Sequence, residues 1–492
     1  MNLINSIQIP EDVTDVIKTF IADFEESDRR QKMTYGEDYY RSNNTEIMSR
    51  QMLIYAEDDD GNEYAIEDPY KANHKLPAGY FKILVDQKVN YLLGKPITLE
   101  SEQVDELEEH LGRKFQTTLL QAGKEASKKV VAWTHPYIDD RGEFKLMNIP
   151  SEQVIPVYSP YDHALLEMII RYYKVRVLNS KNQSITVTRV EVWDSEQVTF
   201  YQENQETGHY ELLSEDDMAE IFGRRYPNPK YHFQKDLNYG KKIYKTQGLS
   251  WGQVPFIALY NNDEEEYDLQ AVKPFIDAYD IVNSDFCNNL EDFQDIYWIL
   301  KGYGGENLEK FLYEVKRYKT LKVDEGGDAK AENIDIPYDA RKEAREGLER
   351  DIFTFGMGVN PNAIGDGNIT NVVIKSRFAL LDLKASAFEL EIKDYIYKVI
   401  EFINRFREIK NMKPIELDDI TFNRSLIMNE VELLKANTEQ RGSISEMTRL
   451  SNHPWVDDPE AEIKDMEAEA PREVSIKLEE EEEGDEEGPE EE

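Results

Sequence analysis

Two long stripes of apolar residues at helical spacing dominate the second half of the chain. The first runs from Leu269 to Phe293 in alternating steps of three and four, with a polar position at Asn283. Such a stripe is typical both of a heptad seam and of an ordinary core-facing helix, and Pro274 favours a helix start near that residue. We therefore expect a helix here whose apolar face needs a covering partner.

The second stripe lies between Asn371 and Pro414, a stretch without internal glycine or proline. A helix of about 38 residues would be roughly 57 Å long at a rise of 1.5 Å per residue. Because this length exceeds the diameter of a small domain, the pattern predicts a helix that crosses or links domains.

The residues between the two stripes predict a small mixed α/β insert. Runs typical of strands flank a helical run over residues 296–322, and a Glu-Gly-Gly-Asp turn at 325–328 precedes a last strand near Ile334–Ile336. A unit of about forty residues is small for independent stability, so it is expected to pack on something else.

A second, shorter helix is predicted from Ala340 to Phe355, followed by a loop. This loop, Gly356–Asn371, holds four glycines and four asparagines. Both residue types tolerate positive φ, so we expect the loop to be mobile.

The first half of the chain mixes helices with strands. From Val130 to about Gln202 the apolar period is two, which predicts a mostly antiparallel sheet, and Met52–Ile66 is expected to form a further hairpin. The predicted helices are 10–42, 79–94 and 102–129, the last divided by Gly112. Helices beside an antiparallel sheet place the fold in the α+β class.

Charge narrows the choice of partners. The formal net charge is −41, and eleven acidic residues in Glu479–Glu492 leave a net −30 on the rest of the chain. Since sequence-independent DNA binding needs Lys and Arg to neutralise phosphates, such a surface should let DNA pass without gripping it. One segment, Arg224–Lys245, is basic, with seven Lys or Arg and one Asp. It fits a nucleic-acid or acidic-partner surface, or simply a solvated hairpin.

Cysteine content and apolar runs argue against secretion and membrane insertion. Cys287 is the only cysteine, which fits a reducing compartment, and its helical setting predicts a small buried side chain. We expect no signal peptide, because the N-terminus has no basic start or apolar core, and no transmembrane segment.

The motifs of common enzymes are absent from the sequence. There is no HExxH pair, no GxxxxGK[ST] loop, no completed GxGxxG and no GxSxG elbow. Asp58, Asp60, Gly61 and Glu67 match four places of a calcium loop, but Ala56 occupies the first ligand place, so a hairpin turn is the preferred interpretation. We expect no catalytic residues, no metal and no cofactor.

Several segments, in order along the chain, resemble portal proteins of tailed bacteriophages, in the form found in siphophages of Gram-positive hosts. The most specific is the block KILVDQKVNYLLGKPITL followed by WGQVPFIALYNN and later by FALLDLKASAFELEI. The matching segments are Tyr35–Arg41, Lys82–Leu99, Trp133–Phe144, Trp251–Asn262, Asp268–Asp280, Phe378–Ile392 and Asn452–Ile463.

The resemblance implies a ring-forming portal fold with an α+β wing, two stem helices, a small α/β clip, a long kinked helix and a helical crown. The implied parts are a wing at 1–266, a first stem helix at 267–293, a clip at 294–339, a second stem helix at 340–356, a channel loop at 357–371, the long helix at 372–409, a crown at 410–470 and a disordered acidic tail at 471–492.

The resemblance also implies function and partners. About twelve copies would form a cyclic oligomer at one capsid vertex, and double-stranded DNA would pass through it during packaging and ejection. Implied partners are the terminase large subunit, the major capsid and scaffolding proteins and a head-completion or adaptor protein. The expected location is the virion, and the host cytoplasm during assembly.

Site residues follow from the same resemblance. Residues expected near DNA in the channel loop are Asn360, Asn362, Ile364, Asp366 and Asn368, and Lys375 and Arg377 could face the lumen. Residues expected to dock partners on the clip are Lys301, Tyr303, Lys310, Lys316 and Arg317.

Two alternatives remain at this stage. An acidic helical scaffold or interaction protein without a DNA channel would also explain the seam and the tail. A carboxylate-based hydrolase or nuclease would need a divalent metal, and no clustered ligand motif supports it.

Overall fold

The computed structural model describes most of the chain in two compact units. One unit is Met1–Ile364 with Arg377–Leu426, and the other is Gly365–Ser376 with Ile427–Glu492. The described residues are 13–57, 60, 62–68, 71–162, 164–178, 183–223, 225–239, 242–292, 297–301, 328–332, 338–363, 370–425, 430–451, 453, 455–456 and 458–469.

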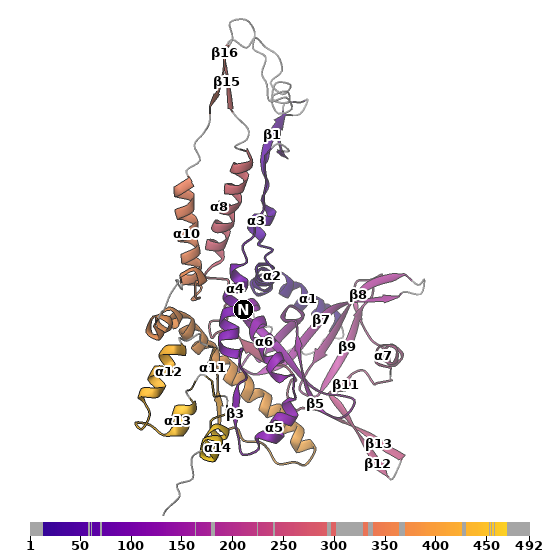
Figure 1. Ribbon diagram of the computed structural model, residues 1–492. Helices are drawn as coiled ribbons and strands as arrows, with labels where there is room; N and C mark the ends of the chain where they lie inside the picture. Colours follow the sequence, from indigo (N-terminus) through magenta and orange to yellow (C-terminus); the bar gives the residue numbers. More distant parts are fainter. Residues whose placement is uncertain are drawn as a thin grey trace, which may run out of the picture. The chain divides into compact units, whose positions relative to one another are not determined.

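The N-terminal region is helical, as expected, but with more breaks (Figure 1). The predicted helix over 10–42 is divided at Ser27, whose Oγ accepts a hydrogen bond from the N–H of Arg30 at 3.1 Å and caps the second helix. Gly112 separates two later helices with a φ of 71°, as predicted. The helices are α1 (Val13–Glu25), α2 (Asp28–Tyr40), α3 (Thr45–Ser49), α4 (Tyr80–Leu93), α5 (Val104–Leu111) and α6 (Phe115–Lys129).

Antiparallel sheets confirm the α+β class. A three-stranded sheet has the order β14-β4-β5, and a larger one has the order β10-β9-β8-β7-β6, with β11 added on β9. The strands are β4 (Val131–Ile138), β5 (Phe144–Ile149), β6 (Val154–Tyr158), β7 (Leu166–Leu178), β8 (Ser184–Trp193), β9 (Gln197–Glu203), β10 (Tyr210–Leu212), β11 (Lys230–Tyr231) and β14 (Ile257–Tyr260), with α7 (Glu215–Phe222) after β10.

The long helix is α11, Asn371–Ile409, and it links the two units as its length predicted. Its first residues, up to Ser376, belong to the smaller unit, and the remainder lies in the core of the larger one. Phe388 and Tyr395 of α11 are fully buried in the same apolar cluster as Phe81 of α4. The Tyr395 hydroxyl also donates to Thr134 Oγ1 at 2.9 Å, which fixes α11 against β4.

The insert between the stripes is described only as a hairpin. Strand β15 (Tyr297–Lys301) pairs with β16 (Asp328–Glu332), so Asp328, predicted in a turn, begins a strand instead. The expected helix and the strand near Ile334–Ile336 lie outside the described residues.

The C-terminal region holds one strand that the sequence did not predict. Strand β17 (Asp419–Thr421) pairs with β3 (Thr98–Glu100), which returns the chain to the region after α4. The helices of the smaller unit are α12 (Glu430–Glu439), α13 (Glu446–Ser451) and α14 (Pro459–Glu469).

Other expectations from the sequence have mixed outcomes. Met52–Ile66 forms a hairpin of β1 (Leu53–Glu57) with β2 (Glu63–Glu67). The basic segment forms a second hairpin, β12 (Phe233–Tyr239) with β13 (Lys242–Leu249), which favours the hairpin interpretation. Cys287 is half-buried in the isolated chain, so the prediction that it is a buried core residue was wrong.

The described ranges contain neither a candidate membrane span nor a candidate metal cluster. None of the helices described combines the length and the hydropathy that crossing a bilayer requires. Among the same residues, no group of three or more His, Cys, Asp or Glu side chains is arranged to hold a metal ion.

Two histidines, the buried His135 and the partly buried His232, predict acid sensitivity of the sheet region. Burial lowers the pKa of both His135 and His232 to about 4. His135 Nδ1 donates to the Pro255 carbonyl at 2.7 Å, and His232 Nδ1 accepts from the N–H of Trp251 at 3.2 Å. The unfolded chain binds protons below about pH 6.5, whereas the folded chain does so only near pH 4, so stability falls as pH falls between these values. Each histidine should lower the free energy of unfolding by about 2 kcal/mol at pH 5 relative to pH 7.

Chemical unfolding at pH 7 and pH 5 measures this effect. The free energy of unfolding differs between the two pH values, and this difference should shrink by about 2 kcal/mol in His135→Phe, since one of the two histidines is gone. His209→Gln, a change at an exposed histidine, serves as the control and should keep the wild-type difference. An undiminished difference in His135→Phe would contradict the assignment of acid sensitivity to this residue.

Candidate functional site

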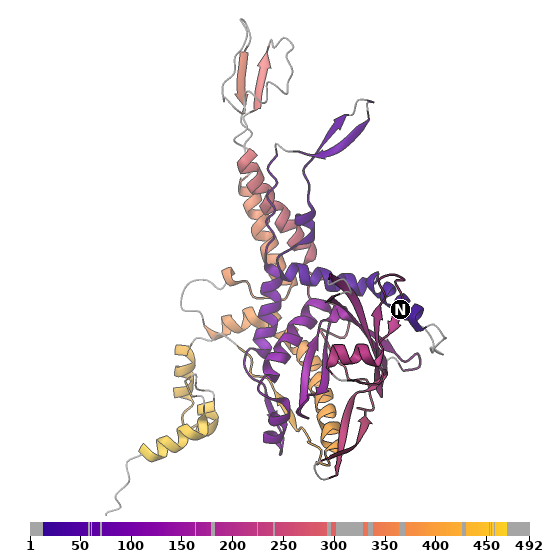
Figure 2. The ribbon, with the colours of Figure 1, turned by 90° about the vertical axis from the view of Figure 1, so that its right-hand side faces the viewer.

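Helices α8 (Lys273–Asp292) and α10 (Tyr338–Phe355) form an antiparallel pair, which is the first part of the candidate functional site (Figures 1 and 2). Phe275 near the start of α8 stacks on Phe355 at the end of α10, with ring centroids 5.0 Å apart. Phe286 near the other end of α8 contacts Tyr338 at the start of α10, with centroids 5.9 Å apart. Aromatic contacts at both ends therefore fix the register of the pair.

An extended segment, residues 71–79, lies along a polar face of α8; we call it the strap. Backbone N–H groups of His74, Leu76 and Ala78 donate to side chains of α8. Their acceptors are Asn288 Oδ1 at 2.6 Å, Ser284 Oγ at 3.1 Å and Asp280 Oδ1 at 2.8 Å. Alternate N–H groups of the strap thus meet side chains one helical turn apart. The strap covers this polar face of α8, which is distinct from the predicted apolar stripe, whose Phe286 contacts α10.

Asp280 is the buried anchor of the strap. It is 1 % exposed, and it accepts a second hydrogen bond from Asn44 Nδ2 at 2.5 Å. Burial raises the pKa of Asp280 to about 6, although both hydrogen bonds favour the ionised form.

A buried cluster of charges joins α4 to α11. Lys88 Nζ donates to Asp268 Oδ2 at 3.1 Å and to Asn261 Oδ1 at 2.5 Å. Lys384 Nζ lies 3.2 Å from the other carboxylate oxygen, Asp268 Oδ1. The Lys88 ammonium also sits over the Phe388 ring, 4.1 Å from its centroid. We call Lys88, Asp268 and Lys384 the charge cluster.

Burial and pairing act on these groups in opposite directions. Burial lowers the pKa of Lys88 to about 8, against the raising effect of Asp268. Burial would raise the pKa of Asp268, but the Lys384 and Lys88 ammonium groups hold it at about 2. Asp268 is therefore ionised near neutral pH and compensates two cations in a site where its own side chain is 5 % exposed.

The loop after α10 is anchored where it begins. Lys384 Nζ donates to the Gly356 carbonyl at 3.1 Å, so the charge cluster reaches this loop directly. Gln87 of α4 donates to the Val359 carbonyl at 2.7 Å and accepts from the Val359 N–H at 3.0 Å. A Cβ at Gly358 would lie 2.4 Å from Leu84 Cδ2, so this glycine allows close packing against α4. Gly356 and Gly358 thus serve packing rather than positive φ, and the mobility of the loop stays a prediction.

The expected channel residues have different outcomes. The amide groups of Asn360 and Asn362 both donate to Glu349 Oε1, at 3.2 and 2.7 Å. Lys375 and Arg377 are exposed on α11. Ile364, Asp366 and Asn368 lie outside the described residues.

The expected clip residues are almost untested. Lys301 ends strand β15. Tyr303, Lys310, Lys316 and Arg317 lie outside the described residues.

The charge cluster and the hydrogen bonds of Gln87 to Val359 were not predicted from the sequence. One signal was available: Lys88 occupies the apolar face of α4, one turn after Leu84 and directly before Val89, where a solvated lysine has no place. No comparable signal marked Asp268 or Lys384, since their positions depend on how distant segments pack.

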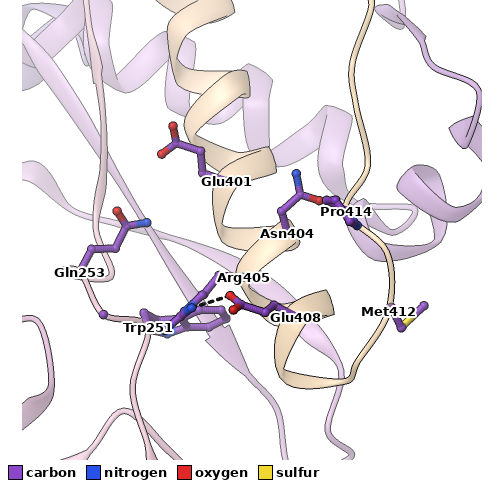
Figure 3. A pocket seen from close by; sticks show the side chains of 9 residues that line it. Trp251, Gln253, Glu401, Asn404, Arg405, Glu408, Met412 and Pro414 are labelled. Carbon is purple, nitrogen blue, oxygen red and sulfur yellow. Dashed lines mark hydrogen bonds and ion pairs between the residues drawn. The ribbon is translucent and has the colours of Figure 1, made fainter.

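A surface hollow of about 560 Å³ lies between the end of α11 and the segment after β13 (Figure 3). Trp251 lies on one side of it, and Arg405 pairs with Glu408 at 2.5 Å within it. The lining residues are Trp251, Gly252, Gln253, Glu401, Asn404, Arg405, Glu408, Met412 and Pro414. Their ionisable members are Glu401, Arg405 and Glu408.

Comparison with known proteins gives a consistent result. A family model described as "Phage portal protein, SPP1 Gp6-like" matches residues 22–475. The portal protein of Clostridium phage phiCD119 is 30% identical over 452 residues, which cover 88% of this chain and 91% of that protein. The portal protein of Bacillus phage SPP1 is 28% identical over 445 residues, covering 88% of this chain and 82% of that protein.

The chain also aligns with solved structures. A chain from the neck of a native GTA particle, computed with C12 symmetry, aligns with a TM-score of 0.33 and 10% identity, over 75% of this chain and 88% of that chain.

Proposed function

Since the chain belongs to the family of SPP1 Gp6-like phage portal proteins, we propose that its copies close into a ring at one capsid vertex and form the channel for DNA packaging and ejection. Portal proteins are structural components of the virion rather than enzymes, which agrees with the absence of catalytic motifs from the sequence. A ring of about twelve copies would be closed by a head-to-tail interface between identical chains.

The observation that supports the proposed ring is an apolar ridge on α11. Leu380, Leu383, Leu390 and Tyr397 recur at steps of three and seven, and they are 44, 64, 68 and 45 % exposed. The opposite face of the same helix is the buried core of the chain. A continuous exposed ridge of this kind is typical of a surface that is covered in an assembly, and a neighbouring copy would cover it.

The parts of the ring are proposed from this family membership. The antiparallel pair α8–α10 would be the stem, and β15–β16 would belong to the clip. The proposed parts are the wing at 1–266, the stem helices at 267–293 and 340–356, the clip at 294–339, the channel loop at 357–371, the long helix at 372–409, the crown at 410–470 and the acidic tail at 471–492.

The channel and its partners follow from the same assignment. The channel loop, with Asn360, Asn362, Ile364, Asp366 and Asn368, would lie near the DNA, and the net charge of −41 would keep the phosphates from adhering. The clip would dock the terminase large subunit during packaging and a head-completion protein afterwards. The capsid and scaffolding proteins would contact the ring at the vertex.

A loop variant tests whether this region acts in DNA passage. Gln87→Leu removes both hydrogen bonds to Val359, and leucine, like glutamine, favours the helical conformation of α4. We expect rings to form normally, whereas DNA packaging into capsids carrying the variant should fall about tenfold, because the loop is no longer held at its anchor. The measurement is the amount of nuclease-protected DNA per assembled capsid.

The control is Asn90→Leu, which changes an exposed amide on the same helix whose side chain bonds only the Asp86 carbonyl. It should package DNA like the wild type. Wild-type packaging by Gln87→Leu would contradict the role of the anchored loop in the channel.

A further inference from the structure

Hairpin β1–β2 exposes apolar side chains. Among the described residues its strands pair only with each other, and Tyr55 and Leu53 are 76 and 51 % exposed. The register places both on one face with Glu63 and Glu67, because Leu53 pairs with Glu67 and Tyr55 with Ala65. A lone two-stranded hairpin is marginally stable in water, so a hairpin of this composition calls for a covering surface.

The strap fixes the side of α8 on which this hairpin stands. The strap bonds Ser284 and Asn288, whereas α10 contacts Phe286. Two residues along a helix correspond to about 200° around its axis, so strap and α10 occupy opposite faces of α8. Figure 1 shows the hairpin and α10 on opposite sides of α8.

The opposite side, at the start of α10, carries a complementary surface. Tyr338 is 57 % exposed, and Arg341, Lys342 and Arg345 follow it at helical spacing. These four residues, here called the α10 patch, line a shallow hollow together with Phe286 and its neighbours on α8. The buried Nη1 of Arg341 has no hydrogen-bond partner among the described residues.

Charge and shape match between the two surfaces. Residues 53–68 contain seven acidic residues and no basic one, around exposed Leu and Tyr side chains. The α10 patch offers three cations beside an exposed tyrosine, at the positive end of a helix dipole. A head-to-tail interface requires two different, complementary surfaces on opposite sides of one chain, and these two surfaces meet that requirement.

We propose that the β1–β2 hairpin of one copy docks on the α10 patch of the next copy and so clasps adjacent stems. This inference rests on the proposed ring and names one contact that closes it. Tyr55 and Leu53 would pack against Tyr338, and Glu63 and Glu67 would pair with Arg341 and Lys342.

Charge reversal on each surface, separately and together, tests the proposal. The first variant carries Glu63→Lys and Glu67→Lys, the second carries Arg341→Glu and Lys342→Glu, and the third carries all four changes. We expect each of the first two to lower the ring fraction at least fivefold, as counted by mass photometry at one fixed protein concentration. The fourfold variant should return to within twofold of the wild type, because opposite charges then face each other again.

Restoration of rings separates a specific contact from general damage, since adding two more changes cannot repair a misfolded chain. Glu108→Lys with Glu109→Lys makes an equal charge change on exposed α5 positions and should leave the ring fraction unaltered. Normal rings from the first two variants, or no recovery in the fourfold variant, would overturn the inference and leave the proposed function standing. A wild-type chain that never forms rings would contradict the proposed function itself.

Discussion

Asp268→Asn is expected to lower the free energy of unfolding by about 3–5 kcal/mol, the range for leaving buried charge without its partner. Asp268 is the only anion of the charge cluster, and Lys88 beside it has a side chain that is 2 % exposed. Without the carboxylate, burial drives the pKa of Lys88 further below its folded value of about 8. The variant should therefore be more stable at pH 9 than at pH 7, because the unfolded chain holds a proton on Lys88 that the folded variant releases.

Urea unfolding of the variant at both pH values measures the loss and its pH dependence. Asp263→Asn, at an exposed position of the segment that leads to Asp268, is the matched control and should change stability by less than about 0.5 kcal/mol. Adding Lys88→Met to Asp268→Asn should recover part of the loss, since it removes one of the two cations left without the carboxylate. A loss below about 1 kcal/mol in Asp268→Asn would show that the cluster does not depend on this carboxylate.

Gly36→Ala is expected to destabilise the chain by about 3 kcal/mol, the upper end for overpacking. A Cβ at Gly36 would lie 1.9 Å from the Lys128 carbonyl oxygen, and backbone cannot rotate away as a side chain can. Helix α2 would have to move off α6, and Tyr39, which is fully buried on the same helix and bonds Asp277, would move with it. The thermal unfolding midpoint of the variant should fall by several degrees.

Gly347→Ala provides the comparison for this substitution. The nearest atom to its Cβ would be Arg350 Nη2, 3.8 Å away, so the methyl group has room. An alanine inside helix α10 should stabilise the chain by about 0.5–1 kcal/mol. The same substitution thus has opposite signs at the two sites. Equal effects at both would contradict the packing of α2 against α6.

Local pattern predicted most of the architecture. The stripe on α11 and the change to a period of two after Val130 each led to the observed helix and sheet, because apolar spacing directly reflects which face is buried. Gly112 was predicted as a helix break for a local reason, and the structure confirms it with a positive φ.

Features that depend on contacts between distant segments were not predictable in this way. The pairing of β17 with β3 joins Ile420 to Leu99, across most of the chain. The strap is polar backbone on a polar helix face, and neither partner shows a periodic signal. The charge cluster left a trace only at Lys88, where a lysine interrupts an apolar face. Asn360 and Asn362 were expected to face DNA. Their bonds to Glu349 were not foreseen, because they too join separate segments.

Native mass and particle shape together show whether copies of the chain close into a ring. Mass photometry of the purified chain, followed by negative-stain imaging of the same sample, gives both. A closed ring is predicted, with an axial hole and a mass near 690 kDa for about twelve copies of a 57.5 kDa chain. Compact monomers or dimers without any ring, across protein concentrations and in the presence of scaffolding protein, would contradict it.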